Sequence, residues 1–295
     1  MIDEKLKYIS ATDQEIELNN KAPYILLTID GAGQAGIDTQ TQKAAYQDGE
    51  TYVDSLLDYR NINIDIIIKA EDEQELFNKR KELQKIFNPK NGPGKLIYTR
   101  AGEEKQVRAI VDDGPDFPSG ENNRGITFQR SSITLLCPSP FWEDIKETGE
   151  PLGFIEGGLT FPLMLNPDVQ EHTLFGRRGF TALLENKGDV PAPVEIVFSG
   201  PAENTKIINK TTGEFIKINQ TIGENEKLHI NTAFGNKRAE IEDENGEMTN
   251  AFHYLDLEST FWELKVGVND VDFESDISKE KASAEISFRN RYVGI

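Results

Sequence analysis

The amino-acid sequence predicts a mainly β protein of two domains, the first of which carries one α-helix. Three observations lead to this fold class. Period-2 alternation of apolar and polar residues dominates the 295-residue chain. One stretch, residues 71–87, instead has its apolar residues at helical spacing. Proline and glycine gather between residues 138 and 158, which predicts a boundary near the middle.

The strands of the first half are led by residues 61–68. Isoleucine occupies every second position from Ile62 to Ile68, and polar residues such as Asn63 lie between them. This pattern is typical of a strand with one buried and one solvated face. The strand predicted at 125–136 should bend or carry a bulge near Ser131 and Ser132, where the alternation slips. Four further strands are predicted from β-branched and aromatic residues: residues 24–29, 95–99, 106–111 and 125–136.

The predicted helix, residues 71–87, begins with acidic residues and continues with basic ones, which suits the helix macrodipole. Asn88 and Pro89 should end it. Its apolar side chains fall on one stripe that can pack against a sheet: Leu76, Leu83, Ile86 and Phe87.

The second half consists of short predicted strands about ten residues apart, as in a β-sandwich. Asn245-Gly246 is the strongest hairpin signal, and residues 211–213 form a second turn. We therefore expect an N-terminal domain over 1–140, an irregular linker over 141–179 and a C-terminal domain over 180–295. The strands predicted for the C-terminal domain are 180–184, 193–198, 206–208, 214–218, 227–230, 238–242, 251–257, 261–266, 271–274 and 284–292.

The charge balance excludes some classes of partner. Asp and Glu total 51 against 32 Lys and Arg, which gives a net charge of −19. Such an excess argues against non-specific binding to nucleic acid or to an anionic membrane, since both are polyanions. Apolar runs such as residues 66–68 are far shorter than a membrane helix. Residues 1–7 lack the apolar segment of a secretory signal, so we expect synthesis in the cytosol.

Gly31, Gly33 and Gly36 form a literal GxGxxG directly after a predicted strand. In a dinucleotide-binding unit this motif opens a helix with an apolar face. Here it leads into residues 37–48, which have too little apolar surface to pack on a sheet. We therefore predict no cofactor site, and a flexible polar loop between Asp30 and Asp58.

Other candidate sites are equally weak. The single cysteine, Cys137, excludes intramolecular disulfides, and its apolar neighbours favour a buried structural role. His172, His229 and His253 are scattered, so they do not form a metal-ligand pattern. Residues 242–246 resemble part of a calcium loop but lack oxygen ligands at its first and last positions, which favours a hairpin turn. The sequence thus predicts no catalytic residues, no metal site and no enzyme.

The two tryptophans, Trp142 and Trp262, each follow a phenylalanine. Core packing is the commoner role for such residues, while an exposed aromatic ring on a β-sandwich can stack on a sugar or on a protein partner. Both tryptophans are therefore kept as candidate contacts with a partner or a sugar.

Several sequence blocks, spread in order over nearly the whole chain, are individually weak but together specific. They lie at residues 49–52, 58–60, 83–89, 94–98 and 135–142 in the first half, and at 185–191, 254–256, 261–269 and 291–294 in the second. Through these blocks the chain resembles the distal tail (Dit) proteins, or siphovirus-type tail components, of phages that infect Gram-positive bacteria and of related prophages. Residues 31–45 match no part of the family pattern.

The resemblance implies an N-terminal β-sandwich or split-barrel domain with one helix, followed by a galectin-like β-sandwich. It also implies a virion structural protein: a hexameric ring that acts as the hub of the tail tip or baseplate. Expected partners are other copies of the chain, the tail-tube protein, the tail-tip fibre or tail-associated lysin, and in some members a receptor-binding protein used in host attachment. The long loop, with Gly31, Gly33, Gly36, Tyr46 and Gly49, is the candidate contact with a neighbouring subunit.

One alternative function stays open. Galectin-like domains suggest a carbohydrate-binding module that recognises host cell-wall polysaccharide. That hypothesis predicts a solvent-exposed tryptophan beside convergent Asn, Arg and His side chains on one sheet face.

Overall fold

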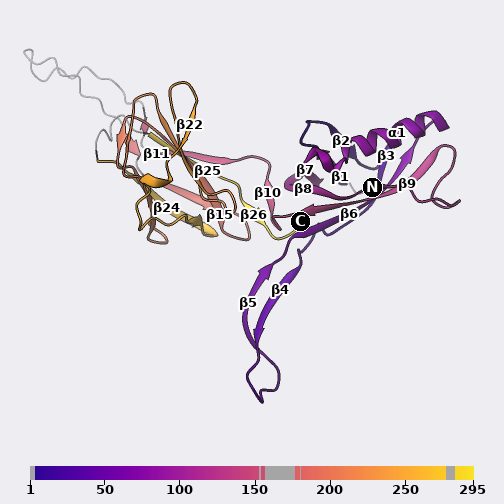
Figure 1. The fold of residues 1–295 in the computed structure, drawn as a ribbon, viewed down its shortest axis with the longest axis horizontal. Coiled ribbons are helices and arrows are strands. Elements are labelled where there is room, and N and C mark those ends of the chain that lie inside the picture. Colours follow the sequence, from indigo (N-terminus) through magenta and orange to yellow (C-terminus); the bar gives the residue numbers. More distant parts are fainter. Residues whose placement is uncertain (1–3, 153, 157–176, 180, 277–282) are drawn as a thin grey trace, which may run out of the picture. The chain divides into compact units, whose positions relative to one another are not determined.

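In a computed structural model, residues 4–152, 154–156, 177–179, 181–276 and 283–295 are described. The chain divides into two compact units (Figure 1). The first comprises residues 1–145 and 291–295, and the second comprises residues 146–290. Both are built from strands, and α1 (Glu73–Ile86) is the only α-helix among the described residues, which confirms the mainly β fold class. Most of the predicted linker, and residue 180 of one predicted strand, lie outside these residues.

The first unit is built on an antiparallel sheet in the order β2-β1-β7-β8-β9-β6-β3. Its two edges approach each other at Asn19, whose N–H donates to the Tyr24 carbonyl and whose carbonyl accepts from the Leu26 N–H at 2.7 Å. The sheet therefore curls into a split barrel. Its strands are β1 (Glu4–Ile9), β2 (Glu15–Leu18), β3 (Tyr24–Asp30), β6 (Arg60–Lys69), β7 (Gly94–Arg100), β8 (Glu103–Asp116) and β9 (Phe128–Cys137).

The predicted isoleucine strand and the predicted helix are confirmed. The four alternate isoleucines of β6 are buried, and they share one core with the apolar stripe of α1. Asp72 caps the helix by accepting a 2.7 Å hydrogen bond from the Glu75 N–H. At the other end, Phe87 stacks on Tyr8 with the ring centroids 4.5 Å apart. A short 3₁₀ turn, η1 (Pro89–Asn91), then leads into β7.

The predicted bulge is on the neighbouring strand. β9 pairs with β6 without interruption through Ser131, which is buried at a core position. The register instead shifts on β8, between Val111 and Asp113 and again between Asp113 and Asp116. The prediction was wrong because a buried serine looks like a break in an alternation of apolar residues, although the backbone pattern continues through it.

The prediction of a long polar loop between Asp30 and Asp58 is also wrong in part. It contains a two-stranded hairpin of β4 (Ile37–Gln42) and β5 (Thr51–Leu57). Period-2 alternation could not reveal these strands, since almost every side chain along them is exposed.

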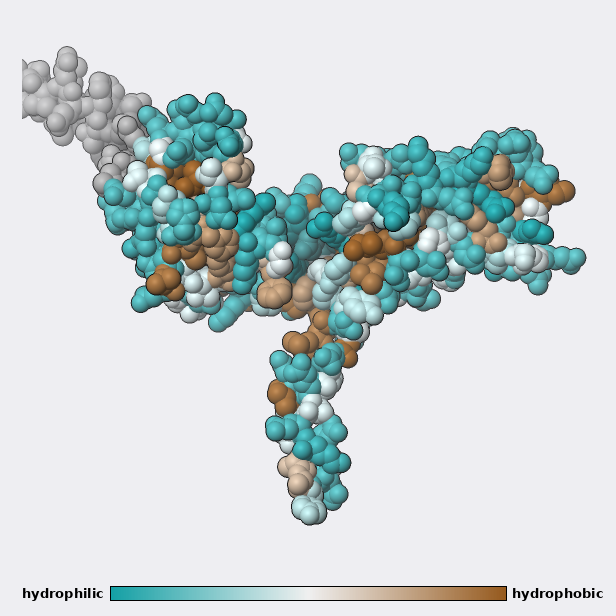
Figure 2. Space-filling model, viewed as in Figure 1, coloured by the Kyte–Doolittle hydropathy of each residue, from teal (hydrophilic) through white to brown (hydrophobic). Residues whose placement is uncertain are grey.

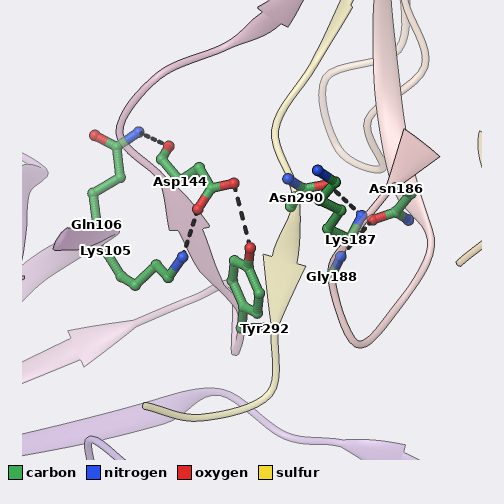
Figure 3. Close-up of polar contacts among 8 residues, drawn as sticks. All are labelled: Lys105, Gln106, Asp144, Asn186, Lys187, Gly188, Asn290 and Tyr292. Carbon is green, nitrogen blue, oxygen red and sulfur yellow. Dashed lines mark hydrogen bonds and ion pairs between the residues drawn. The ribbon is translucent and has the colours of Figure 1, made fainter. Parts of the chain in front are cut away.

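Residues 291–295 return to the first unit. There β26 (Arg291–Tyr292) pairs with β10 (Trp142–Asp144), which also pairs with β8. Figure 3 shows Asp144 at the centre of the polar contacts that hold these strands. It accepts from Lys105 Nζ at 2.7 Å and lies 3.4 Å from the Tyr292 hydroxyl. Burial opposes the charge on Lys105, but hydrogen bonds with Asp144 and Tyr292 outweigh it and raise the lysine pKa.

The second unit is a β-sandwich whose two sheets contribute to one core. One sheet has the order β11-β25-β15-β20-β21-β22, with β23 against β15, and the other has the order β14-β24-β17-β18. Two short pairs, β12 with β13 and β16 with β19, complete it. The strands are β11 (Thr148–Leu152), β12 (Phe154–Glu156), β13 (Arg177–Gly179), β14 (Thr181–Asn186), β15 (Ala192–Ser199), β16 (Ala202–Glu203), β17 (Lys206–Asn209), β18 (Glu214–Lys217), β19 (Thr221–Ile222), β20 (Lys227–Asn231), β21 (Arg238–Glu242), β22 (Met248–Asn250), β23 (Glu263–Leu264), β24 (Gly267–Glu274) and β25 (Ser283–Phe288).

The predicted hairpin at Asn245-Gly246 is confirmed, because it joins the paired strands β21 and β22. The strand predicted at 251–257 is wrong, and a 3₁₀ turn, η2 (Phe252–Tyr254), stands there. Within the turn the N–H groups of Phe252, Tyr254 and Leu255 donate to the Asn250 side chain and to the carbonyls of Ala251 and Phe252, so they are not free for a ladder. The strand predicted at 284–292 is two strands, interrupted where the Asn290 side chain accepts from the Lys187 N–H at 2.9 Å (Figure 3). No helix in the described ranges is long and apolar enough to cross a bilayer.

Candidate assembly interface

The β4–β5 hairpin, residues 37–57, extends away from the sheet of the first unit and is called the arm below (Figure 1). Ile37 pairs with Leu57 at its base and Gln42 with Thr51 near its tip. Apart from Gln47 and Leu57, which are half-buried, its side chains are all exposed. β4 and β5 form a two-stranded sheet by themselves, so among the described residues both of its outer edges lack a neighbouring strand.

Several large apolar side chains of the arm are exposed to solvent. Figure 2 shows hydrophobic residues interspersed along it and gathered toward its base. An isolated two-stranded hairpin is marginally stable in water, so these side chains are suited to being covered by another surface. Its charged residues are mostly acidic: Asp38, Asp48, Glu50 and Asp54 against Lys43. Its large exposed apolar residues are Ile37, Tyr46, Tyr52, Val53 and Leu56.

The predicted interface residues occupy the two ends of this structure. Tyr46 lies in the tip turn, is fully exposed and has a positive φ of 62°, and Gly49 closes the same turn. Gly31, Gly33 and Gly36 lie at the base, where the Asp58 N–H donates to the Gly36 carbonyl at 2.8 Å. Tyr46 and Gly49 therefore lie at the tip of the arm, and Gly31, Gly33 and Gly36 lie just before its first strand; that they contact a neighbour stays a prediction.

The base of the arm is built around a buried cation. The Arg60 side chain is 1% exposed, and the partners that hold its guanidinium are backbone carbonyl oxygens. Nη1 donates to the carbonyls of Gly31 and Gly33, Nε and Nη2 donate to Pro140 at 3.0 and 2.8 Å, and Nη2 also donates to Val293 at 2.6 Å. Burial lowers the pKa of Arg60, but a guanidinium stays protonated in proteins.

Sequence analysis missed this role of Arg60, although one signal was present. Arg60 has the same parity as the buried isoleucines of β6, so it had to point inward. Burying a charged residue at an inward strand position costs folding free energy unless all of its donors have hydrogen-bond partners. Such a residue therefore indicates a specific set of acceptors around it. Only the resemblance blocks included it, without a role.

The same carbonyl run is held from a second side. Trp142 Nε1 donates to the Ala32 carbonyl at 2.9 Å, and its ring lies 5.8 Å from the Arg60 guanidinium carbon. The GxGxxG segment is thus followed by strand β4, and no helix N-terminus is present to receive a pyrophosphate. Residues 31–36 form no regular secondary structure, as predicted for a loop, and side chains from other elements bind the carbonyls of Gly31, Ala32 and Gly33.

Neither tryptophan presents a ring to solvent within its own unit. Trp142 is buried in the core of the first unit and Trp262 in the core of the second. A sugar cannot stack on either ring without a rearrangement of the core. Their predicted role as partner or sugar contacts therefore receives no support, and core packing describes them.

The remaining candidates have structural roles where they are described. Cys137 is fully buried, and burial raises the pKa of its thiol to about 12. Asp243 accepts hydrogen bonds from the N–H groups of Glu247 and Asn245, which lower its pKa and shape the hairpin turn. His229 Nε2 lies 2.7 Å from Glu242 Oε2. No cluster of metal-ligating side chains is found in the described ranges, and His172 lies outside them.

Both units correspond to known phage tail domains. The model of the phage tail protein RIFT-related domain matches residues 12–137, and that of the siphovirus-type tail component C-terminal domain matches residues 187–292. Together they define a phage tail component of two β domains. The chain belongs to the siphovirus-type tail component, or distal tail (Dit), family. No curated protein sequence matches it.

Solved structures share the fold across the whole chain. The Dit protein of phage SPP1 (gp 19.1), described as a paradigm of the hub adsorption apparatus in phages that infect Gram-positive bacteria, has a TM-score of 0.64 and 12% identity. That match covers 97% of this chain and 98% of the SPP1 chain. A chain of the phage P2 baseplate in its activated conformation with Ca has a TM-score of 0.54 and 12% identity, with 100% of both chains covered. At this identity the likeness concerns the fold.

Proposed function

We propose that this chain is a structural hub of a siphophage-type tail tip or baseplate, without enzymatic activity. Six copies form a ring that joins the tail tube to the tail-tip fibre or tail-associated lysin, and to a receptor-binding protein where one is present. It is made in the bacterial cytoplasm and works at the tip of the virion tail. The observation that carries this proposal is the exposed arm, with its large apolar side chains, on a base held by Arg60 and Trp142.

A ring needs a heterologous interface, in which one patch of each copy binds a different patch of the next. The arm supplies one such patch, because its unpaired strand edges and exposed apolar residues have no partner within the described chain. Docking on a neighbour would bury side chains such as Tyr52 and Leu56 and complete the hairpin's edges. Six copies at −19 each repel one another, but salt screens charges farther apart than about 8 Å, so the contacts themselves decide.

Native mass spectrometry over a range of protein concentrations tests the proposal. We expect six copies for the parent chain, and smaller species for a variant in which residues 38–56 are replaced by Asn-Gly. This replacement keeps the Gly36–Asp58 hydrogen bond. A milder variant, Tyr52→Ser with Leu56→Ser, should also weaken the ring.

The matched control is Leu183→Ser with Val268→Ser, which removes two exposed apolar residues from a strand pair of the second unit. This control should keep the parental assembly. A parent chain that stays monomeric at every concentration, alone and with the tail-tube protein, would exclude the hub role.

A second candidate function is carbohydrate binding through the outer face of the sheet that contains β20 and β21. The half-buried His229 and the exposed Arg238 lie there on adjacent strands, whereas Asn231, the strand partner of Arg238, is buried and bonds to Glu195 and to the Ala233 N–H. Such neighbouring donors and acceptors suit hydroxyl-rich ligands, although no tryptophan accompanies them. Titration with host cell-wall polysaccharide, comparing the parent with Arg238→Ala and with Lys206→Ala on the other sheet as control, tests it. Binding that Arg238→Ala abolishes supports this function, and no binding by the parent excludes it.

A further inference from the structure

Arg60 joins three stretches of the first unit that are far apart in sequence. It is the first residue of β6 and follows the last residue of the arm, Leu57, by three positions. Its donors reach the carbonyls of residues 31 and 33, which precede the arm, of Pro140 and of Val293. One side chain therefore ties both feet of the arm to two other segments of the unit.

The chemistry of this site needs a guanidinium. Four carbonyls converge on one buried group, and only the planar fork of five N–H donors can serve them together. A lysine in the same place offers three donors from one nitrogen, so some carbonyls would stay unpaired away from water. A neutral side chain would leave them all unpaired.

Neighbouring contacts leave the segment 31–33 little freedom to shift. The Ala32 carbonyl, between the two that Arg60 binds, accepts from Trp142 Nε1 and from the Ile295 N–H. A Cβ added to Gly294 would lie 2.7 Å from the Gly33 carbonyl oxygen, so the backbones are in close contact there. The carbonyls of this segment are thus held from several directions at once.

We propose that Arg60 is a positioning residue for assembly: it fixes the direction in which the arm leaves the first unit. The arm and the split barrel then move as one body, and docking on a neighbouring copy does not have to order the base of the arm. This inference rests on the proposed function in that the arm is the docking element. A residue that merely filled the core would stabilise the unit without controlling the arm.

Pulsed electron paramagnetic resonance measures that control directly. Nitroxide labels are placed at Ser55→Cys, near the foot of the arm, and at Lys95→Cys on β7; both positions are exposed. The native Cys137 is buried, and a Cys137→Ala background removes any labelling there. Dilution with unlabelled protein removes distances between copies. The parent should give a narrow distance distribution.

Arg60→Lys should broaden that distribution about twofold or more, because the lysine cannot hold all four carbonyls. Trp142→Phe, which removes only the donor to Ala32, should broaden it less. The matched control is Tyr24→Phe, which removes a buried hydroxyl that bonds to Glu82 and lies at the end of β3 remote from the arm. This control should leave the width unchanged.

An unchanged width in folded Arg60→Lys would overturn the inference, whatever the loss of stability. If that variant does not fold, Trp142→Phe decides alone: a broader distribution supports the inference and an unchanged one refutes it. Native mass spectrometry of the same variants separates the two proposals, since Arg60→Lys should form the ring about tenfold more weakly. If the parent forms no ring while the width still responds to Arg60→Lys, the hub proposal fails and the positioning role stands.

Discussion

Trp142 Nε1 donates a 2.9 Å hydrogen bond to the carbonyl oxygen of Ala32, 110 residues earlier in the chain. The indole therefore fastens the base of the arm from inside the core. Trp262, the other tryptophan, is buried to the same degree, but its Nε1 has no hydrogen-bond partner among the described residues. The two residues make a natural pair for measuring what this hydrogen bond does.

We predict that Trp142→Phe loosens the base of the arm while Trp262→Phe does not. Both changes remove similar volume from a core, but only the first removes a donor from a buried carbonyl, which costs about 1 kcal/mol. Hydrogen exchange measured by mass spectrometry should show the Asp58 amide, bonded to Gly36, exchanging about fivefold faster in Trp142→Phe. Equal exchange at Asp58 in both variants would remove the indole's role at the arm.

Gly31 should be the most demanding glycine at the arm. Its φ is +87°, and a Cβ there would lie 1.9 Å from the Asn61 carbonyl oxygen. Gly49, in the tip turn, has a φ of +74° but open space around it. We expect Gly49→Ala to cost about 1 kcal/mol of unfolding free energy, the strain of a left-handed backbone. Gly31→Ala should cost about 3 kcal/mol or more, since the backbone must also move.

Urea unfolding followed by circular dichroism compares these two variants within one unit, so changes in the other unit do not enter. Similar costs for both would mean that β3 and β6 separate easily near Gly31. That result would contradict a rigid base.

The strands and helix that sequence predicted well are those with one buried face. In β6 the isoleucines at even positions supply a period that only a half-buried strand explains, and α1 has the matching helical stripe. The physical reason is that the buried positions of a strand or helix take apolar residues, so the period of the element appears in the sequence. The sequence blocks that resemble the distal tail proteins then indicated the family.

The arm could not be predicted in the same way, because none of the residues that the structure describes buries it. Its residues from Ile37 to Leu56 show no period, and an exposed hairpin leaves the same composition as a loop. At Ser131 the predicted bulge was wrong because a polar residue occupies a buried position, which looks like a break in the apolar pattern. Arg60, like Ser131, is a polar residue at a buried strand position. Its partners are backbone carbonyl oxygens, which every residue has, so the sequence does not show which of them the guanidinium binds.

Cys137 should be inert toward thiol reagents in the folded protein. Its side chain is fully buried, and the raised pKa leaves almost no thiolate at pH 8. The Ser55→Cys variant supplies an exposed thiol on the arm as a control for reagent and pH. We expect one equivalent of reagent to react rapidly with the engineered thiol. Cys137 should react only after denaturant is added. Rapid labelling of the parent would mean that β9 opens near the base of the arm.

The stability of the first unit should fall as the pH rises above about 9. The thiol of Cys137 has an ordinary pKa of 9.0 when unfolded and about 12 when folded, so the unfolded state loses its proton first. Between these values the folded state binds more protons, and the linkage relation makes the unfolding free energy decrease with pH. The slope for one such group approaches about 1.4 kcal/mol per pH unit. Burial raises the pKa of Tyr8 and Tyr24 as well, which steepens the fall above pH 10.

Urea unfolding at pH 8, 9 and 10 measures this slope, and Cys137→Ala isolates the contribution of the thiol. The alanine variant lowers stability at every pH by leaving a small cavity, but it should decline less steeply than the parent between pH 9 and 10. The Ser55→Cys variant, whose added thiol is exposed and has no reason to differ between the folded and unfolded states, should keep the parental slope. Parallel curves for the parent and Cys137→Ala would show that the thiol ionises as readily in the folded chain as in the unfolded one, which contradicts its full burial on β9, between β8 and β6.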